Sequence, residues 1–193
     1  LPDGSKDASF FLGTGFNNKV YTSLLQPDGK ILVAGSFTQF NGTAVGRLVR
    51  LNPDGSRDSS FTASPGATNS IIYNMVLQSD GSIFLVGSFT SFNGTAANRI
   101  VKILPSGAVD TSFVVGSGAS GLIEKVALQP DGKIIIGGGF SSFNGVSVGK
   151  IARLNANGTL DTSFVTGVGF DDNVSAIGVQ ADGKIILGGS FTT

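Results

Sequence analysis

The chain has 193 residues and no net charge, with 13% charged residues, roughly half the usual share of about 25%. This balance argues against wrapping nucleic acid or binding an anionic membrane surface. Because the sequence contains no cysteine and no histidine, it excludes disulfides, zinc sites built from these ligands, and Ser-His-Asp or Cys-His catalysis.

In chain order, residues 20–61 contain four predicted strands, which we call A to D. Strand A covers residues 20–25 and strand B residues 30–37. The turn Gln26-Pro27-Asp28-Gly29 joins them into a hairpin, because proline presets φ and glycine accepts a positive φ. Strand C covers residues 47–51, and strand D is the short stretch that ends in Asp58-Ser59-Ser60-Phe61.

These elements recur along the chain. The glycines of the A–B turns are Gly29, Gly81, Gly132 and Gly183, separated by 52, 51 and 51 residues. The segment Asp-x-Ser-Phe ends at Phe10, Phe61, Phe113 and Phe164, and Phe-Asn-Gly begins at Phe40, Phe92 and Phe143. Four antiparallel strands repeated every 50 residues or so are typical of propeller blades.

The repeat predicts an all-β fold, a β-propeller of four-stranded antiparallel blades with a period of about 51 residues. Strand B is a continuous apolar run, such as Ile134-Ile135-Ile136, which indicates that neighbouring blades cover both faces. A glycine follows each run, where the missing Cβ would let the adjacent blade approach; these are Gly35, Gly87, Gly138 and Gly189. A parallel β-solenoid is the alternative, but its repeats normally span only about 20–30 residues.

The predicted propeller has three complete blades and two partial ones. Its repeat units are residues 1–19, 20–71, 72–122, 123–173 and 174–193. The first unit supplies only a strand D and the last only strands A and B, so strand C is missing. Strand D points the same way as strand B and cannot replace strand C in an antiparallel blade. We therefore expect the chain to be part of a larger ring, closed by further blades or another subunit.

Several motifs together resemble the delta-60 repeat β-propellers of large bacterial exported and surface proteins. They are Leu-x-Pro-Asp-Gly-Ser-x-Asp-x-Ser-Phe, Leu-Gln-Pro-Asp-Gly-Lys-Ile, Gly-Ser-Phe-Thr and Phe-Asn-Gly-Thr, and they cover essentially the whole chain. The departures are Pro105-Ser106-Gly107, Ala156-Asn157-Gly158 and Val146, which are tolerated turn variants. The resemblance implies a propeller fold and a secreted or cell-surface location in bacteria, and it leaves the biochemical function open.

Most aspartates recur once per blade, which favours a structural role. In Asp-x-Ser-Phe we expect the Asp and Ser side chains to bond nearby backbone N–H groups. A calcium site made of Asn52, Asp54 and Asp58 is an open alternative, although the full Asp-rich loop spacing is lacking. Arg47 and Arg50, which recur on strand C, are expected to be solvated strand ends or cross-strand partners. No cofactor is expected.

Three carboxylates break the repeat: Glu124, Asp171 and Asp172. A general acid/base pair needs two groups that flank one bond, and the sequence gives no sign that these converge, so solvated loop carboxylates are favoured. Glu124 stands at the register of Tyr21 and Tyr73, whereas the two aspartates match asparagines in a loop of the same shape. The candidate ligand-binding residues at these positions are Asn17, Asn18, Tyr21, Tyr73, Glu124, Asp171 and Asp172.

Phe-Asn-Gly is the repeated candidate for recognition. Its Asn-Gly favours a tight turn and its phenylalanine suits a core cap. An aromatic face and an amide repeated around a ring would alternatively bind sugars. The residues concerned are Phe40, Asn41, Phe92, Asn93, Phe143 and Asn144. The loops between strands D and A vary most among the copies, so we expect specificity on the face that they share with the B–C loops.

The predicted function is a non-enzymatic scaffold for surface display, adhesion or ligand binding. A glycan or another protein is the expected partner. The alternative is a propeller-type glycoside hydrolase or lyase that uses Glu124, Asp171 or Asp172.

Overall fold

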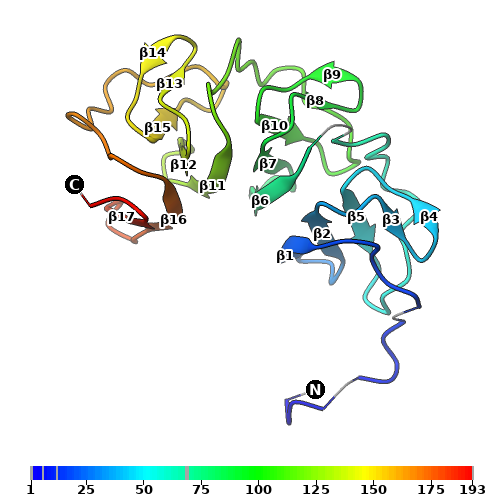
Figure 1. Cartoon of the computed structure of the whole chain (residues 1–193). Helices are drawn as coiled ribbons and strands as arrows, with labels where there is room; N and C mark the ends of the chain where they lie inside the picture. Colours follow the sequence, from blue (N-terminus) through cyan, green and yellow to red (C-terminus); the bar gives the residue numbers. More distant parts are fainter. Residues whose placement is uncertain (1, 6, 12, 68–69, 193) are drawn as a thin grey trace.

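The computed structural model describes residues 2–5, 7–11, 13–67 and 70–192, so the predicted outer boundaries at residues 1 and 193 lie outside the described residues. Within the described part of the chain, all regular structure is β, and the sheets are arranged as the blades of an open arc (Figure 1). The predicted all-β propeller is confirmed. No helix in the described ranges is long and apolar enough to cross a membrane.

Each complete blade contains one three-stranded antiparallel sheet. The sheets are β1 (Val20–Leu25), β2 (Ile31–Gly35) and β5 (Leu48–Leu51); β6 (Ile72–Leu77), β7 (Ile83–Gly87) and β10 (Ile100–Ile103); and β11 (Ile123–Leu128), β12 (Ile134–Gly138) and β15 (Ile151–Leu154). A fourth unit contains β16 (Val174–Val179) paired with β17 (Ile185–Gly189). The first strand of each unit lies on the inner edge of the arc (Figure 1).

A two-stranded hairpin follows the middle strand of each complete blade. The hairpins are β3 (Gln39–Phe40) with β4 (Thr43–Ala44), β8 (Ser91–Phe92) with β9 (Thr95–Ala96), and β13 (Ser142–Phe143) with β14 (Val146–Ser147). The Phe-Asn-Gly segment makes each hairpin turn, and Asn41 adopts a left-handed φ of 49° there. Asparagine tolerates this conformation because its short polar side chain can bond locally.

Strand D is shorter than the sequence predicts. Among the described residues it is reduced to an isolated antiparallel bridge in each blade, at Arg57, Val109 and Leu160. Pairing stops after the first of these bridges because Asp58 Oδ1 accepts a hydrogen bond from the Ser60 N–H at 2.9 Å. This local hydrogen bond turns the chain. The described residues between 2 and 10 form no strand.

The hydrophobic core lies between the blades. Leu32 and Leu48 of the first blade belong to one buried cluster with Ile72, Met75 and Leu85 of the second. A second cluster joins the second and third blades in the same way. Leu32 is fully buried in the middle strand, as expected for a strand covered on both faces. Each such side chain contributes about 1.5–3 kcal/mol relative to exposure.

The segment after each Asp-x-Ser-Phe crosses to the next blade. The Thr62 N–H donates to the carbonyl of Ser106 at 2.8 Å, and the Val114 N–H donates to that of Asn157 at 2.9 Å. The Phe11 N–H donates to the carbonyl of Asp54 in the same manner, at 2.6 Å. Neighbouring units are therefore held together by backbone hydrogen bonds as well as by apolar packing.

Candidate functional site

Every inner strand carries a β-bulge at the same place. The pairing of β1 with β2 passes from Val20↔Gly35 to Thr22↔Ala34, which leaves Tyr21 as the extra residue. The same break leaves Tyr73 in β6, Glu124 in β11 and Ser175 in β16 as the extra residues. A bulge bends its strand and re-aims one side chain, and bulges are frequent beside functional sites.

The glycine at the end of each middle strand makes the bulge possible. A Cβ on Gly35 would clash with the carbonyl oxygen of Lys19, which accepts a hydrogen bond from the Ser36 N–H at 3.0 Å. The other three glycines face equivalent carbonyls, those of Ile71, Leu122 and Asn173. The prediction that these glycines let the adjacent blade come close is therefore wrong. The glycines make room for the residue that precedes strand A of their own unit.

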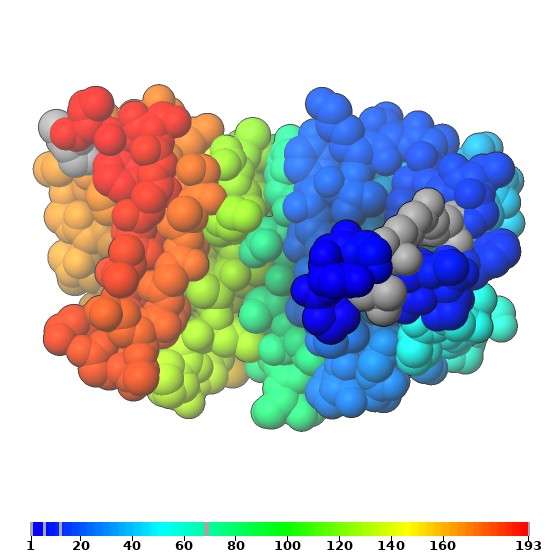
Figure 2. Space-filling view, turned by 90° about the horizontal axis from the view of Figure 1, so that it is seen from below, coloured from blue at the N-terminus to red at the C-terminus, as the bar shows by residue number. Residues whose placement is uncertain are grey.

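The four bulge residues line an open hollow of about 390 Å³ on the inner side of the arc, together with Leu122 and Lys125. Figure 2 looks onto the open side of the arc, with the green inner strands between the blue first blade and the orange to red β16 and β17. The rings of Tyr21 and Tyr73 meet edge to face, with centroids 5.3 Å apart and an interplanar angle of 85°.

The structure thus brings together three predicted candidates, Tyr21, Tyr73 and Glu124. Asn173 Nδ2 donates to Glu124 Oε1 at 3.2 Å and so orients the carboxylate. Sequence reasoning missed Lys125, which also lines the hollow. The sequence feature that could have revealed Lys125 is its place directly after the non-repeated Glu124, in strand A, whose residues differ among the repeats.

The candidate loop residues have structural partners. Asp171 accepts hydrogen bonds from the Thr192 N–H at 2.8 Å and the Thr192 hydroxyl at 2.6 Å. Asn17 makes the equivalent contact, with its Oδ1 accepting from the Thr38 N–H at 2.8 Å. Both residues tie the loop before strand A to the segment after strand B. They are not among the residues that line the hollow.

Asp172 and Asn18 also play matching parts. Asp172 Oδ1 accepts a hydrogen bond from the Asn173 N–H at 2.7 Å, and Asn18 Oδ1 accepts one from the Lys19 N–H at 2.8 Å. Each side chain therefore caps the next backbone N–H at the entry to strand A. Replacing the asparagine by aspartate keeps this arrangement because the acceptor is an oxygen in both.

The phenylalanines of the Phe-Asn-Gly motif face inward, whereas the asparagines lie nearer the surface. Phe40, Phe92 and Phe143 are only 4%, 0% and 0% exposed, so their ring faces lie in the core. Asn41 Oδ1 accepts a hydrogen bond from the Gly15 N–H at 2.7 Å, and Asn93 and Asn144 do the same with Gly66 and Gly118 at 2.8 Å. These groups hold each hairpin to the loop before strand A.

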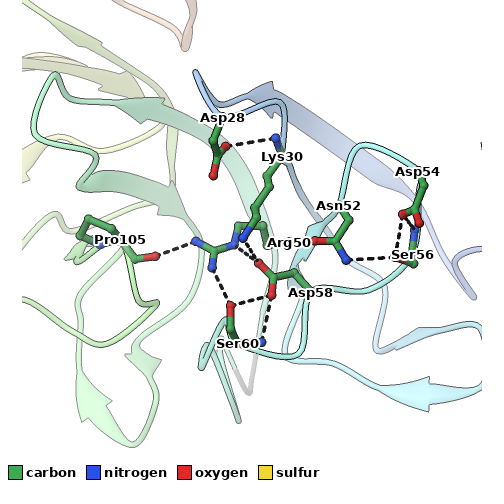
Figure 3. A network of polar contacts seen from close by, with 9 residues as sticks. All are labelled: Asp28, Lys30, Arg50, Asn52, Asp54, Ser56, Asp58, Ser60 and Pro105. Atoms are coloured by element: carbon green, nitrogen blue, oxygen red, sulfur yellow. Dashed lines mark hydrogen bonds and ion pairs between the residues drawn. The ribbon is translucent and has the colours of Figure 1, made fainter.

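A buried ion-pair network occupies the Asp-x-Ser-Phe segment of the first blade (Figure 3). Asp58 Oδ2 accepts from Lys30 Nζ and Arg50 Nε, each at 2.8 Å. Its Oδ1 accepts from the Ser60 N–H and hydroxyl, as the motif predicts. Arg50 Nη1 also donates to the Pro105 carbonyl of the second blade at 2.7 Å. The expectation of a cross-strand partner for Arg50 is confirmed, and the alternative of a solvated strand end is wrong.

The network recurs in the other blades with local changes. In the third blade, Asp161 Oδ2 accepts from Lys133 Nζ at 2.9 Å and Arg153 Nε at 2.7 Å. In the second, Lys102 Nζ pairs with Asp110 Oδ2 at 3.1 Å. Burial raises the pKa of Asp58, but hydrogen bonds from Lys30 and from Ser60 and Arg50 outweigh it and hold the pKa well below 3.8.

These contacts bear on the calcium alternative at Asn52, Asp54 and Asp58. A metal ion at Asp58 would have to displace the ammonium and guanidinium groups that already pair with it. Asn52 Nδ2 donates to Ser56 Oγ at 3.0 Å, and Asp54 accepts from the same hydroxyl at 2.6 Å. The described residues contain no group of three or more acidic side chains placed to hold a metal.

The protein is a repeat β-propeller. Each blade repeats the same sheet, the inner strands carry the same bulge, and the hydrophobic cores lie between the blades. The chain belongs to the family described as "Domain of unknown function (DUF5122) beta-propeller", whose model matches residues 26–61, 78–113, 129–164 and 180–193. The complete matches run from the A–B turn to the phenylalanine of Asp-x-Ser-Phe. The comparison with curated proteins finds no match.

A solved structure with the same fold is the extracellular domain of BT4673, a protein assigned as a one-component system from B. thetaiotaomicron. The two share 16% sequence identity at a TM-score of 0.54, over 93% of this chain. This chain spans about a fifth of the length of that structure, 21%. At this identity the similarity shows the fold.

Proposed function

We propose that the chain is a non-catalytic binding scaffold that acts outside the cell, in adhesion, surface display or ligand capture. The observation that carries this proposal is the isolation of Glu124. Among the described residues, it is the one carboxylate that lines the inner hollow. Glycoside hydrolysis ordinarily needs two carboxyl groups about 5–9.5 Å apart. Asp171 and Asp172, the other non-repeated carboxylates, are engaged by Thr192 and Asn173.

Two similarities to other proteins support a location outside the cell. The fold is shared with a domain whose name places it outside the cell in B. thetaiotaomicron. The motif resemblance to delta-60 repeat propellers implies export or display at a bacterial cell surface. On this basis we propose that the partner is a glycan or another protein presented outside the cell.

A glycan array and a panel of glycosidase and lyase substrates test the proposal on the purified chain. We expect retention of some glycans or of a surface protein, with no turnover of any substrate. Turnover that Glu124→Gln or Asp171→Asn abolishes, and that the turn variant Asp28→Asn retains, would overturn the non-catalytic assignment.

A further inference from the structure

We infer that the inner hollow binds a neutral sugar, with Tyr21 and Tyr73 as the aromatic platform and Glu124 and Lys125 as hydrogen-bonding groups. This inference rests on the proposed binding function and names its site and ligand class. It locates recognition on the inner side of the arc, apart from the Phe-Asn-Gly hairpins.

At each bulge the backbone geometry is constant among the units, whereas the side chain of the bulge residue changes. The backbone break and its opposing glycine recur in all four units, so they belong to blade construction. The residue re-aimed by the bulge differs, being Tyr21, Tyr73, Glu124 and Ser175 in turn. All four residues line one hollow, so the bulge fixes where each side chain lies and the sequence varies the chemical group presented there. Such an arrangement is suited to recognising a ligand.

The two tyrosines form a corner built from two blades. Their rings stand at 85° to each other with centroids 5.3 Å apart, and Tyr21 is 44% exposed. An aromatic ring has a negative face, which attracts the polarised C–H groups on the apolar side of a pyranose. Aromatic side chains with a few placed polar groups are the usual lining of small-ligand sites.

The polar lining favours an uncharged ligand. Glu124 and Lys125 carry opposite charges, so the hollow offers no net attraction for a cation or an anion. Among the described residues, neither forms an ion pair. The carboxylate accepts hydrogen bonds, the ammonium donates them, and the Ser175 hydroxyl does both. This mixture suits sugar hydroxyls, which also donate and accept.

The composition of the chain provides a direct probe. It contains two tyrosines and no tryptophan, and both tyrosines line the hollow. Tyrosine fluorescence, and circular dichroism in the tyrosine part of the near-ultraviolet spectrum, will therefore report on this site. The titrants are soluble cello-, xylo- and manno-oligosaccharides, with tetramethylammonium and sulfate as charged probes. We expect a saturable change with at least one neutral sugar and none with either ion.

Variants then locate the site by calorimetry. We expect Tyr73→Ala to weaken sugar binding by about tenfold or more, as for a central aromatic contact, and Glu124→Gln to weaken it several-fold. Phe11→Ala is the matched control, since Phe11 is an exposed aromatic residue outside the hollow. It should bind as the parent chain does. Tyr73→Phe, which keeps the ring, should retain most of the affinity and guards against misfolding of the alanine variant.

The outcomes distinguish this site from the general proposal. Sugar binding that Tyr73→Ala and Glu124→Gln leave unchanged would overturn the site and leave the binding scaffold standing. Saturation by tetramethylammonium in place of sugars, or no response to any sugar, would overturn the ligand class. Turnover of a bound sugar would overturn the non-catalytic proposal and leave the site in place.

Discussion

Arg50 of the first blade donates a hydrogen bond from Nη1 to the carbonyl oxygen of Pro105 in the second blade, over 2.7 Å. The same guanidinium pairs through Nε with Asp58 of its own blade at 2.8 Å. One side chain thus closes its blade and fixes the neighbouring one. Arg47 holds the loop that leads to the second blade, because its Nη1 donates to the carbonyl of Ala67. Ala67 in turn forms a β-bridge with Phe92 of that blade.

We predict that Arg50→Lys lowers the free energy of unfolding by about 1.5–3 kcal/mol, the scale of a hydrogen bond to a charged group. Lysine can still pair with Asp58 but cannot make the guanidinium fork. Arg153→Lys is the control, because Arg153 makes the equivalent bonds to Asp161 and Ser163 and, among the described residues, no bond to another unit. Urea denaturation measures both variants, and equal losses would contradict the inter-blade role.

We predict that acid destabilises the chain through the Asp58 and Asp161 pairs. At Asp58, burial raises the pKa, but hydrogen bonds from Lys30, Ser60 and Arg50 outweigh it and hold the folded-state pKa below 3.8. At Asp161, hydrogen bonds from Lys133, Ser163 and Arg153 likewise lower the pKa below 3.8. A carboxyl with a lowered folded pKa contributes stability above its unfolded pKa, and this contribution is lost as the pH falls through the folded pKa. The urea midpoint should therefore hold from neutral pH to near pH 4 and decline below it.

Two variants check the source of this decline. Asp58→Asn should be less stable by about 3 kcal/mol at neutral pH, since it leaves Arg50 buried without its carboxylate, and should decline less in acid. Asp28→Asn, at an exposed turn, should follow the parent profile. Parallel acid profiles for Asp58→Asn and the parent chain would show that other groups cause the loss.

We predict that Gly189→Ala disrupts the fourth unit and that Gly188→Ala does not. A Cβ at Gly189 would overlap the carbonyl oxygen of Asn173, whereas one at Gly188 would make ordinary contact with the Ala176 side chain at 3.4 Å. Hydrogen exchange of the β16 and β17 amides should rise at least about tenfold for the first variant, a local opening cost lowered by roughly 1.4 kcal/mol. Equal protection in both variants would disprove the role of the bulge.

We predict that Asn41→Gly costs less stability than Asn41→Ala. Asn41 has a φ of 49° and accepts a hydrogen bond from the Gly15 N–H at 2.7 Å. Glycine loses the hydrogen bond, about 1 kcal/mol, but keeps the left-handed turn at little cost. Alanine loses the bond and adds roughly 1–2 kcal/mol of steric strain. Thermal denaturation ranks the two, and the reverse order would show that the backbone conformation is not limiting.

Much of the architecture follows from the sequence because it depends on local chemistry repeated in every unit. Pro-Asp-Gly specifies a hairpin turn, and an apolar run such as Ile134-Ile135-Ile136 specifies a strand covered on both faces. The Asp-x-Ser side-chain bonds to backbone N–H groups are local as well, and the structure has them at Asp58 and Ser60. Interactions over two to six residues leave a readable pattern in a single chain.

The candidate site could be predicted only in part from the sequence, because it depends on which units contact each other and on where a β-bulge interrupts the strand pairing. The sequence placed Tyr21, Tyr73 and Glu124 at one register, but alternation along a strand does not reveal the bulge that re-aims them. It also treated Phe40 and Asn41 as candidates for recognition, although packing between hairpin and loop buries the ring and engages the amide. The repeat period and the turn chemistry of the sequence determined the blades. Tertiary packing decided which side chains face the hollow. The contact between Tyr21 and Tyr73 spans 52 residues of sequence and exists only when two blades lie side by side.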